Sequence, residues 1–341
     1  ILYMNNKILV IGDLILDQYG YGKYTKFSAE APVPVLELEK TEYRLGGAAN
    51  VALNLQQLGA NYQYITVIAE DENYSTAIKL LNELETRTII AKTSNTIKVR
   101  IISGSQQVMR IDSDNKIFLS DNKVGEYLNT VCWSLNSGEF SILVISDYDK
   151  KLLTHKMIQK IVECAVYNNV KVLVDTKKKN TECFSGSYLI TPNVLEHGEL
   201  LRNSDFRDNH IKYWLITDGA NGMALYPENI HIPAIPVKNA DVSGAGDTVL
   251  ATIAAELAEG VELLQACRTA AVAAYVVVSK EGTSTCSRKE IEQALNRGVC
   301  KHYTLPDLIY QVNLWKDQGY NVNIANGCFD FLHEGHLHLL R

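Results

Sequence analysis

The chain has 341 residues, of which 46% are hydrophobic and 21% are charged. This composition is ordinary for a globular protein and excludes a wholly disordered or collagen-like chain. The formal net charge of −6 provides no global basic field, so we expect no nucleic-acid partner unless a local basic groove exists.

Seven cysteines are scattered along the chain without a CxxC pair, which favours free thiols in a reducing compartment over a disulfide framework. The first residues are a short polar lead into a strand and do not resemble a signal sequence. The longest apolar runs, such as 270–279, are shorter than a membrane span. We therefore expect a cytoplasmic protein without a membrane partner.

Short β-branched runs alternate with segments whose apolar residues recur at helical spacing. In chain order, this pattern predicts strands at 7–12, 64–69, 141–146, 171–175, 188–191 and 214–217. It predicts helices at 47–58, 75–84, 154–167 and 245–257. The alternation indicates an α/β fold with a mainly parallel sheet, and the continuous apolar strands indicate burial on both faces.

Two stretches, 19–38 and 96–112, have strand character without following helices. Two interpretations fit them equally: a small accessory sheet, which in a sugar-binding enzyme would be a lid, or an edge hairpin. A domain boundary is predicted near 297–304. Beyond it, the pattern predicts a helix at 305–318, a strand at 320–325 and a loop that runs into a helix at 326–341.

The strongest local motif is Asp241-Val-Ser-Gly-Ala-Gly-Asp-Thr248, which precedes an apolar helix. Its glycines, Gly244 and Gly246, allow a tight turn that leaves amide groups open at a helix start, and such a turn binds anions. Asp247 would lie in the first turn, where an acidic residue is also ordinary helix capping. Together with the long apolar helix, these features favour a carboxylate that removes a hydroxyl proton while the amides hold a phosphoryl group.

This GAGD motif resembles the signature of the ribokinase-like sugar kinases. The similarity is greatest to one branch, the kinase half of the bifunctional heptose-7-phosphate kinase/heptose-1-phosphate adenylyltransferases. The supporting motifs follow in the family's order along residues 7–341: Gly12-Asp-Leu-Ile-Leu-Asp17, Ala29-Glu-Ala-Pro-Val-Pro34, Gly46-Gly-Ala-Ala-Asn50, Gln106-Gln107 with Arg110 and Asp112, Ser146-Asp-Tyr148, Thr191-Pro-Asn193 with Glu196, and Gly282-Thr-Ser-Thr285.

The resemblance implies a ribokinase-like three-layer fold with a small β lid, followed by the truncated start of a Rossmann-like nucleotidyltransferase unit. The kinase domain would span 1–300, and a linker with the second unit 301–341. Asp247 would be the catalytic base. The matching anion hole would comprise Gly244, Ala245 and Gly246, and the ATP-binding segment Asn193, Val194, Leu195 and Glu196. Glu196 would hold Mg²⁺ through water, since this ion often takes only one or two carboxylates.

The resemblance also assigns the sugar side. Contacts to the sugar would come from Asp13, Asp17, Gly46, Gly47 and Asn50, whose carboxylates and amide suit a polyol because they offer donors and acceptors. The sugar phosphate would be bound by Lys98, Arg100, Arg110 and Lys177. Taken singly, each of these basic residues is more typical of a solvated charge or a salt-bridge partner.

The segment Asn326-Gly-Cys-Phe-Asp-Phe-Leu-His-Glu-Gly-His336 resembles the opening motif of nucleotidyltransferases. In that motif His333 and His336 would contact nucleotide phosphates. A metal-binding tract that includes His338 is the alternative, although no cysteine or carboxylate set completes a zinc shell.

Three positions depart from the family pattern. Lys151 replaces a glycine, the run Asp175-Thr-Lys-Lys178 replaces Asp-Pro-Lys-Gly, and an asparagine near the adenine site is replaced around Ala271.

The resemblance implies transfer of the γ-phosphoryl group of ATP to O1 of D-glycero-β-D-manno-heptose 7-phosphate, in ADP-heptose synthesis for lipopolysaccharide core. The full-length protein would also be a heptose-1-phosphate adenylyltransferase. We expect a homodimer whose small-molecule partners are heptose phosphate and ATP. A kinase for another sugar or nucleoside, and a non-catalytic sugar or nucleotide sensor, remain as alternatives.

Overall fold

A computed structural model describes residues 6–104, 106–113, 115–203, 210–238, 240–280 and 282–296, and also 308–309, 312, 316 and 321–323. The chain divides into two units, Ile1–Arg297 and Gly298–Arg341, and every labelled helix and strand lies in the first. Within the predicted helix 305–318, the four described residues are helical, whereas 321–323 of the predicted strand are not in a strand. His333 and His336 lie outside the described residues.

In the described part of the chain, nine strands form one large sheet in the order β13-β12-β11-β10-β9-β8-β1-β4-β5. The strands from β11 to β5 pair in parallel, and β12 and β13 extend the sheet antiparallel. Their bounds are β1 Lys7–Gly12, β4 Tyr62–Ala69, β5 Thr86–Ala91, β8 Phe140–Asp147, β9 Lys171–Thr176, β10 Leu189–Ile190, β11 Tyr213–Thr217, β12 Met223–Tyr226 and β13 Ile230–Ile232. All six predicted strands are present, and the prediction of a mainly parallel sheet is confirmed.

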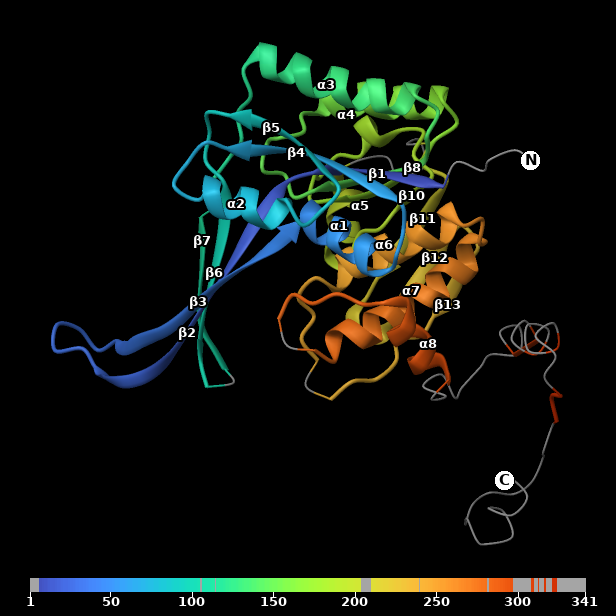
Figure 1. Ribbon diagram of the computed structural model, residues 1–341. Coiled ribbons are helices and arrows are strands. Elements are labelled where there is room, and N and C mark those ends of the chain that lie inside the picture. Colours follow the sequence, from blue (N-terminus) through green and yellow to red (C-terminus); the bar gives the residue numbers. More distant parts are fainter. Residues whose placement is uncertain are drawn as a thin grey trace, which may run out of the picture. The chain divides into compact units, whose positions relative to one another are not determined.

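Helices cover both faces of the large sheet (Figure 1). Helices α3 and α4 lie on one face, and α1, α6 and α7 lie on the other. The helix bounds are α1 Ala48–Gln57, α2 Tyr74–Leu81, α3 Asp121–Asn136, α4 His155–Tyr167, α5 Val194–Asn203, α6 Ala245–Ala258, α7 Leu263–Val278 and α8 Arg288–Asn296. Because helices cover both faces, Ile8, Leu9, Val10 and Ile11 of β1 are all fully buried.

Helix α4 shows how the local sequence sets these elements. Thr154 caps its first turn by accepting a hydrogen bond from the Met157 amide at 3.3 Å. The buried residues recur at helical spacing, which places one apolar stripe against the sheet: Met157, Ile158, Ile161, Val162 and Ala165. The chain leaves the helix through Asn169, whose φ of 57° is left-handed.

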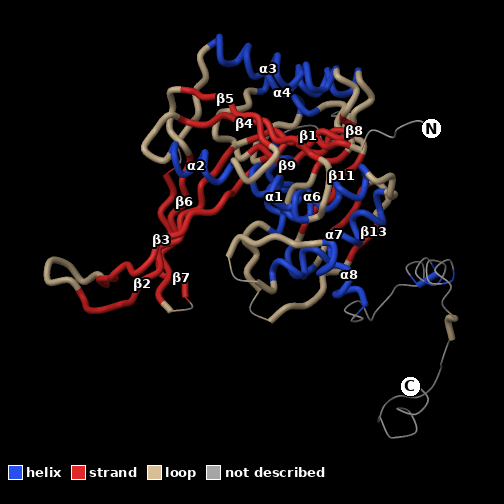
Figure 2. Tube along the Cα trace, in the orientation of Figure 1, coloured by secondary structure: helices blue, strands red, loops and turns tan. Residues whose placement is uncertain are grey.

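A separate four-stranded sheet, which we call the lid sheet, has the order β3-β2-β6-β7. It comprises β2 Leu14–Phe27, β3 Pro34–Gly47, β6 Thr96–Ser103 and β7 Gln106–Ser113. Figure 2 shows β2 and β3 extending well away from the helices. The accessory-sheet interpretation is therefore confirmed and the edge hairpin is wrong. Strand β2 begins five residues earlier than the predicted stretch, so the lid sheet also includes Asp17.

The two faces of the lid sheet differ in character. Asp17 pairs with Arg44 and Lys98, and Tyr19 pairs with Glu42 and Arg100, so these polar side chains share one face. On the opposite face, Gly20 leaves room for neighbouring apolar groups. A Cβ there would lie 2.9 Å from Ile101 Cδ1 and 3.1 Å from Leu38 Cδ2.

Gly12 ends β1 at the point where the chain enters the lid sheet, with φ of 145°. A Cβ at this position would lie 1.9 Å from the Ser146 carbonyl oxygen and 2.9 Å from the Ala48 Cβ. We expect Gly12→Ala to lower the free energy of unfolding by about 3 kcal/mol or more. Urea denaturation measures this loss of stability, with Gly125→Ala in α3 as the control. A Cβ at Gly125 meets nothing within 4 Å, so this substitution is expected to be neutral or stabilising. Equal unfolding midpoints for the two variants would refute this account of Gly12.

Candidate active site

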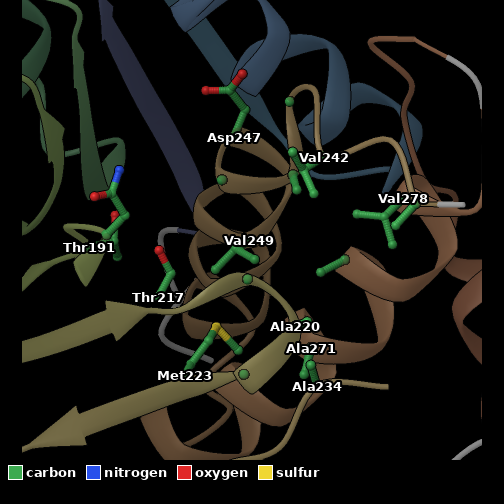
Figure 3. Close-up of a pocket in the computed structure, with 18 of the residues that line it drawn as sticks. Thr191, Thr217, Ala220, Met223, Ala234, Val242, Asp247, Val249, Ala271 and Val278 are labelled. Atoms are coloured by element: carbon green, nitrogen blue, oxygen red, sulfur yellow. The ribbon is translucent and has the colours of Figure 1, made fainter. Parts of the chain in front are cut away.

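A cavity of about 460 Å³ lies where strands of the large sheet end and α6 begins. Ligand sites in open α/β sheets form at the carboxyl ends of the strands. The residues that line this cavity are Tyr148, Asp175, Lys177, Thr191, Asn193, Glu196, Thr217, Gly219, Ala220, Gly222, Met223, Ala234, Ile235, Pro236, Val237, Ala240, Val242, Gly244, Ala245, Gly246, Asp247, Val249, Ala271, Ala274, Tyr275 and Val278. Figure 3 shows Asp247 at one end, and Met223 with Ala220 and Ala271 at the other. The cavity thus has a polar end and an apolar end.

The turn that precedes α6 forms the polar end. Gly244 is the N-cap of the helix in a left-handed conformation, with φ of 76°, and its Cβ would lie 2.8 Å from Asn50 Nδ2. The three predicted anion-hole residues all line the cavity. The Ala245 amide donates to the Val242 carbonyl at 3.2 Å, so this amide already has a partner. The start of α6 carries the positive end of the helix dipole.

Asp247 lies in the first turn of α6 and is buried. Asn50 Nδ2 donates to its Oδ2 at 2.8 Å, and the Tyr148 hydroxyl donates to its Oδ1 at 2.9 Å. Burial raises its pKa to about 7, and the carboxylate of Asp175 adds to the rise. The two hydrogen bonds and the Lys177 cation oppose the rise. A carboxylate with a pKa near neutrality suits proton transfer.

Hydrogen bonds among buried polar residues of α1 and α6 hold Asn50 in place. Asn54 Nδ2 donates to the Asn50 carbonyl at 2.8 Å, and the Thr248 hydroxyl donates to Asn54 Oδ1 at 3.0 Å. All three side chains are buried. Asn54 Nδ2 also donates to Asn50 Oδ1 at 3.4 Å, which helps to direct the side-chain amide of Asn50 at Asp247. The contact of Asn50 with the sugar stays a prediction.

Asp13, predicted as a sugar contact, also holds the backbone that follows β8, which the sequence did not indicate. It is fully buried, and its Oδ2 accepts from the Tyr148 amide at 2.8 Å and from the Lys150 amide at 3.3 Å. Burial and the neighbouring Asp147 raise its pKa to about 7. Asp13 is not among the residues that line the cavity. Its Oδ1 has no hydrogen-bond partner in the described structure, so one buried acceptor remains open.

Asn193 and Glu196 meet at the start of α5. The Glu196 amide donates to Asn193 Oδ1 at 2.9 Å, and the Asn193 amide donates to Glu196 Oε2 at 3.0 Å. This reciprocal pair is a capping box, which explains the spacing without reference to a ligand. Both residues also line the cavity, and the other Glu196 oxygen accepts from Lys177 at 2.5 Å. Of the two residues between them, Leu195 is 82% exposed, so its side chain points away from the protein.

Lys177 belongs to the same group. It lies between Glu196 and Asp175, with Asp175 Oδ1 at 3.8 Å, and it lines the cavity. Burial alone would lower its pKa, but the two carboxylates outweigh burial and raise it. The sequence assigned Lys177 to the sugar phosphate. Its position beside Glu196 favours the other side of the cavity, with the residues predicted to bind ATP.

The lid sheet brings a second polar group together around Asp17. Arg100 Nη1 donates to Asp17 Oδ1 at 2.6 Å, and the Thr283 hydroxyl donates to Oδ2 at 3.3 Å. Gly46 leaves room for this carboxylate, because a Cβ there would lie 2.7 Å from Oδ2. Gly47 is the N-cap of α1 with φ of 62°. Predicted residues Asp17, Gly46 and Arg100 therefore lie together.

The remaining predicted cations differ in position. Lys98 is near the site, with Nζ 5.2 Å from the centre of the Tyr148 ring, and burial lowers its pKa. Arg110 lies on the edge strand β7, is 57% exposed and pairs with Asp112 at 3.0 Å. The strand register places Arg110 directly opposite Arg100, on the same polar face of the lid sheet as Lys98. A contact of these three cations with a sugar phosphate stays a prediction.

The departures from the family pattern have physical consequences. Lys151 has φ of 71°, a left-handed conformation that a glycine adopts without cost, so the glycine of the family is explained. Lys178 stabilises this turn through two ion pairs, with its Nζ 3.2 Å from Asp147 Oδ2 and 2.9 Å from Asp149 Oδ1. Ala271 lines the cavity at its apolar end, where the asparagine was expected.

Several residues of the site were not predicted. The Arg44 guanidinium lies 4.5 Å from the Tyr19 ring centre, and the Tyr19 hydroxyl accepts from the Thr283 amide at 3.1 Å. Tyr148 and Asp175 occur in motifs that the sequence marked but received no role. Thr283 lies in the marked Gly282-Thr-Ser-Thr285 motif, which was the one available signal for its contact with the lid sheet.

Within the described ranges, no group of three or more His, Cys, Asp and Glu side chains is placed to hold a metal ion. Among the same residues, no helix has both the length and the apolar character needed to span a membrane.

Comparison with known proteins decides the family. The model of the pfkB family carbohydrate kinases matches residues 5–290. The chain belongs to the pfkB carbohydrate kinase family. It is therefore an ATP-dependent carbohydrate kinase, and the predicted fold and enzyme class are confirmed.

Among curated members of this family, the chain is similar to the bifunctional protein HldE of Haemophilus influenzae strain PittEE. The two are 35% identical over 360 residues, which cover 98% of this chain and 73% of the relative. HldE of Sulfurimonas denitrificans is 34% identical over 359 residues, with 98% and 75% covered. The resemblance to the bifunctional branch is confirmed, and the chain spans about three quarters of the length of these relatives.

Solved structures show the fold. Phosphofructokinase-2 from Escherichia coli, in complex with potassium, superposes with a TM-score of 0.70 at 19% identity and covers 85% of this chain and 98% of that one. Ribokinase from Thermotoga maritima gives a TM-score of 0.64 at 22% identity, with 85% and 99% covered. The ribokinase-like architecture is thus confirmed.

Proposed function

We propose that this kinase transfers the γ-phosphoryl group of ATP to O1 of D-glycero-β-D-manno-heptose 7-phosphate and forms the 1,7-bisphosphate. The observation that carries the proposal is Asp247: a buried carboxylate with a pKa of about 7 at the start of α6, in a cavity that also holds the nucleotide-side residues. Asp247 takes the proton of the sugar hydroxyl. The amides of Gly244 and Gly246 in this turn stabilise the charge that develops on the transferred group.

ATP would occupy the cavity with its base at the apolar end, beside Met223 and Ala271, and its phosphates at the polar end. Lys177 supplies a cation there, and the carboxylates of Glu196 and Asp175 line the same wall. A site with one or two carboxylates beside a polyphosphate suits Mg²⁺, because this ion keeps several of its bound waters. When bound, Mg²⁺ would offset phosphate charge, and Glu196 would hold it through water.

The sugar would lie between the large sheet and the lid sheet. Asp17 and the open Oδ1 acceptor of Asp13 suit hydroxyl groups of a polyol. Lys98, Arg100 and Arg44 present positive charge from the polar face of the lid sheet, which favours a phosphorylated sugar. This set supports heptose 7-phosphate over an unphosphorylated sugar or a nucleoside.

The experiment that tests the proposed function is an assay of ADP formation with ATP, Mg²⁺ and a panel of free and phosphorylated sugars and nucleosides. We expect the highest kcat/KM with heptose 7-phosphate. A higher value for ribose, fructose 6-phosphate or a nucleoside would identify a related kinase with another substrate. Absence of turnover with every member would favour a non-catalytic sensor.

A homodimer is the assembly that the lid sheet supports. Leu38, Met109 and Ile111 are 57%, 54% and 50% exposed, and the strand register places them on the apolar face with Ile101. Contiguous exposed apolar residues mark interfaces. A second copy would bury this face with matching residues, and the polar face of each lid sheet would remain directed at its own site.

Light scattering after size-exclusion chromatography tests this assembly. The unmodified chain is expected to elute as a dimer, and Met109→Glu as a monomer, because an uncompensated charge in an apolar interface is costly. Val166→Glu, at an exposed position of α4, is the matched control and should remain a dimer. A dimeric Met109→Glu variant would rule out this face as the interface.

The second unit, beyond Arg297, is proposed as the beginning of a nucleotidyltransferase domain. The support is the motif from Asn326 to His336 together with the HldE relatives, whose name describes a bifunctional protein. His333 and His336 would contact the nucleotide phosphates of that domain. A protein that carries this domain would also catalyse adenylyl transfer to heptose 1-phosphate.

A further inference from the structure

The side chain of Tyr148 contacts the base directly, and phosphoryl transfer as described above gives it no role. Tyr148 follows β8 and lines the cavity. Its hydroxyl donates to Asp247 Oδ1 at 2.9 Å, while Asn50 Nδ2 donates to Oδ2 at 2.8 Å. Each oxygen of the carboxylate therefore has one neutral donor, and each keeps lone pairs for a further partner.

Three separate elements hold Tyr148 in place. Its amide donates to Asp13 Oδ2 at 2.8 Å, which anchors the backbone to the start of the lid sheet. Lys98 of the lid sheet lies 5.2 Å from the ring centre, and Lys177, which follows β9, lies 5.7 Å from it. Cations at these distances are attracted to the face of an aromatic ring. The phenol is thus held between the sugar side and the nucleotide side.

Tyr148 is suited to donate and unsuited to act as the base. Burial and the carboxylates of Asp247 and Asp175 raise its pKa well above the ordinary value for tyrosine. The hydroxyl consequently keeps its proton over the working range of the enzyme. A permanent neutral donor beside a buried carboxylate favours the ionised form of that carboxylate.

We propose that Tyr148 is a positioning residue that, through its hydrogen bond to Oδ1, holds Asp247 ionised and in one orientation for attack by the sugar hydroxyl. This inference rests on the proposed function, in which Asp247 receives the hydroxyl proton. No proton leaves Tyr148 in the reaction. The proton passes from the sugar O1 to Asp247, and the oxygen forms its bond to the γ-phosphorus as the bond to ADP breaks.

The other groups around Asp247 define what the hydrogen bond must offset. Asp175 at the end of β9 opposes ionisation of Asp247, and Lys177 favours it. From α1 the neutral Asn50 donates to the carboxylate. Charged groups also lie one contact further from Asp247. Glu196 of α5 pairs with Lys177, and Asp17 and Lys98 of the lid sheet face Tyr148. Tyr275 of α7 lines the same cavity.

The direction of the expected pH effect follows from this arrangement. The hydrogen bond lowers the pKa of Asp247 from what burial alone would give, so its removal raises the pKa above about 7. Activity requires the ionised base and is lost as the pH falls through this pKa. Loss of the Tyr148 hydroxyl therefore moves the acid limb of the kcat profile to higher pH, by about one unit. At pH 7 such a shift lowers kcat about fivefold, and at high pH kcat recovers to within about twofold of the unmodified enzyme.

The experiment compares the pH dependence of kcat for the unmodified chain and Tyr148→Phe, which keeps the ring between the two lysines. Tyr188→Phe is the matched control, because Tyr188 packs against Tyr213 at 5.1 Å and does not line the cavity. Its profile should not move. The KM for ATP is expected to be unchanged in both variants, since neither removes a predicted nucleotide contact.

A second substitution keeps the test decisive if Tyr148→Phe folds poorly. Site-specific replacement of Tyr148 by 3-fluorotyrosine retains the shape and makes the hydroxyl a stronger donor, so the acid limb should move to lower pH. Opposite shifts in the two variants support the proposal. An unmoved acid limb in both variants, with or without a uniform loss of kcat, overturns it. If Asp247→Asn retains its activity, the proposed function itself fails, which distinguishes that outcome from a failure of the inference alone.

Discussion

An Asp247→Asn variant is expected to keep its fold and its affinity for ATP and to lose about 10²–10⁴-fold in kcat. The amide oxygen can still accept from Asn50 Nδ2, and the amide nitrogen can donate to the Tyr148 hydroxyl, which replaces the bond that Tyr148 now makes. The geometry is therefore retained, but the amide cannot take a proton at neutral pH. Only the proton-transfer contribution to catalysis is removed.

Steady-state kinetics with saturating sugar and ATP measures the loss, and calorimetric titration with ATP checks binding. The matched control is Asp241→Asn, in the same motif. The Asp241 carboxylate accepts hydrogen bonds from the Ser243 and Gly282 amides at 3.0 and 2.8 Å, so it stabilises the loop and has no part in proton transfer. That control should lose thermal stability more than it loses kcat. Near-normal kcat in Asp247→Asn would remove Asp247 from the role of base.

The second large effect concerns the phosphate of the substrate. We expect kcat/KM for heptose 7-phosphate to exceed that for free heptose by about 10²–10⁴-fold. The reason is that charge-assisted hydrogen bonds from Lys98 and Arg100 would be lost with the phosphate. Both cations lie on the polar face of the lid sheet, and burial lowers the pKa of Lys98, as expected for a cation without a full set of partners.

Competition between the two sugars in one assay measures the ratio. Lys98→Gln should reduce it at least tenfold, whereas Lys23→Gln, at an exposed lid-sheet position paired with Glu39, should leave it unchanged. Equal kcat/KM values for the phosphorylated and free sugars would contradict the assignment of a sugar phosphate and favour a general sugar kinase.

Much of the fold could be predicted because the central strands are uniformly apolar. Strand β1 was predicted with the bounds that the structure has, since burial on both faces leaves no alternation to interpret. Helix α7 was noticed only as the apolar run 270–279. Packing against α6, α8 and β13 removes the polar face that would have revealed its period. Strand β5, Thr86–Ala91, lies at the sheet edge, and only Ile89 and Ala91 of its six residues are buried, so it lacks a continuous apolar run.

The site was predictable where a motif is local and was missed where contacts join distant segments. The turn Gly244–Gly246 and Asp247 lie within four residues, so their meeting follows from the sequence. Tyr148 and Asp247 are 99 residues apart, and Asp17 and Thr283 are 266 apart. No periodicity relates such pairs, because only the order of strands in the sheet brings them together.

Phosphorus NMR spectroscopy on heptose 7-phosphate, ATP and Mg²⁺ with this chain tests most directly whether Asp247 drives transfer to O1. The account predicts a new signal from an anomeric phosphate that grows in equal amount to ADP, with the 7-phosphate retained, and no such signal with Asp247→Asn. Phosphorylation at another hydroxyl, release of inorganic phosphate without a sugar bisphosphate, or the same product from Asp247→Asn at a similar rate would contradict it.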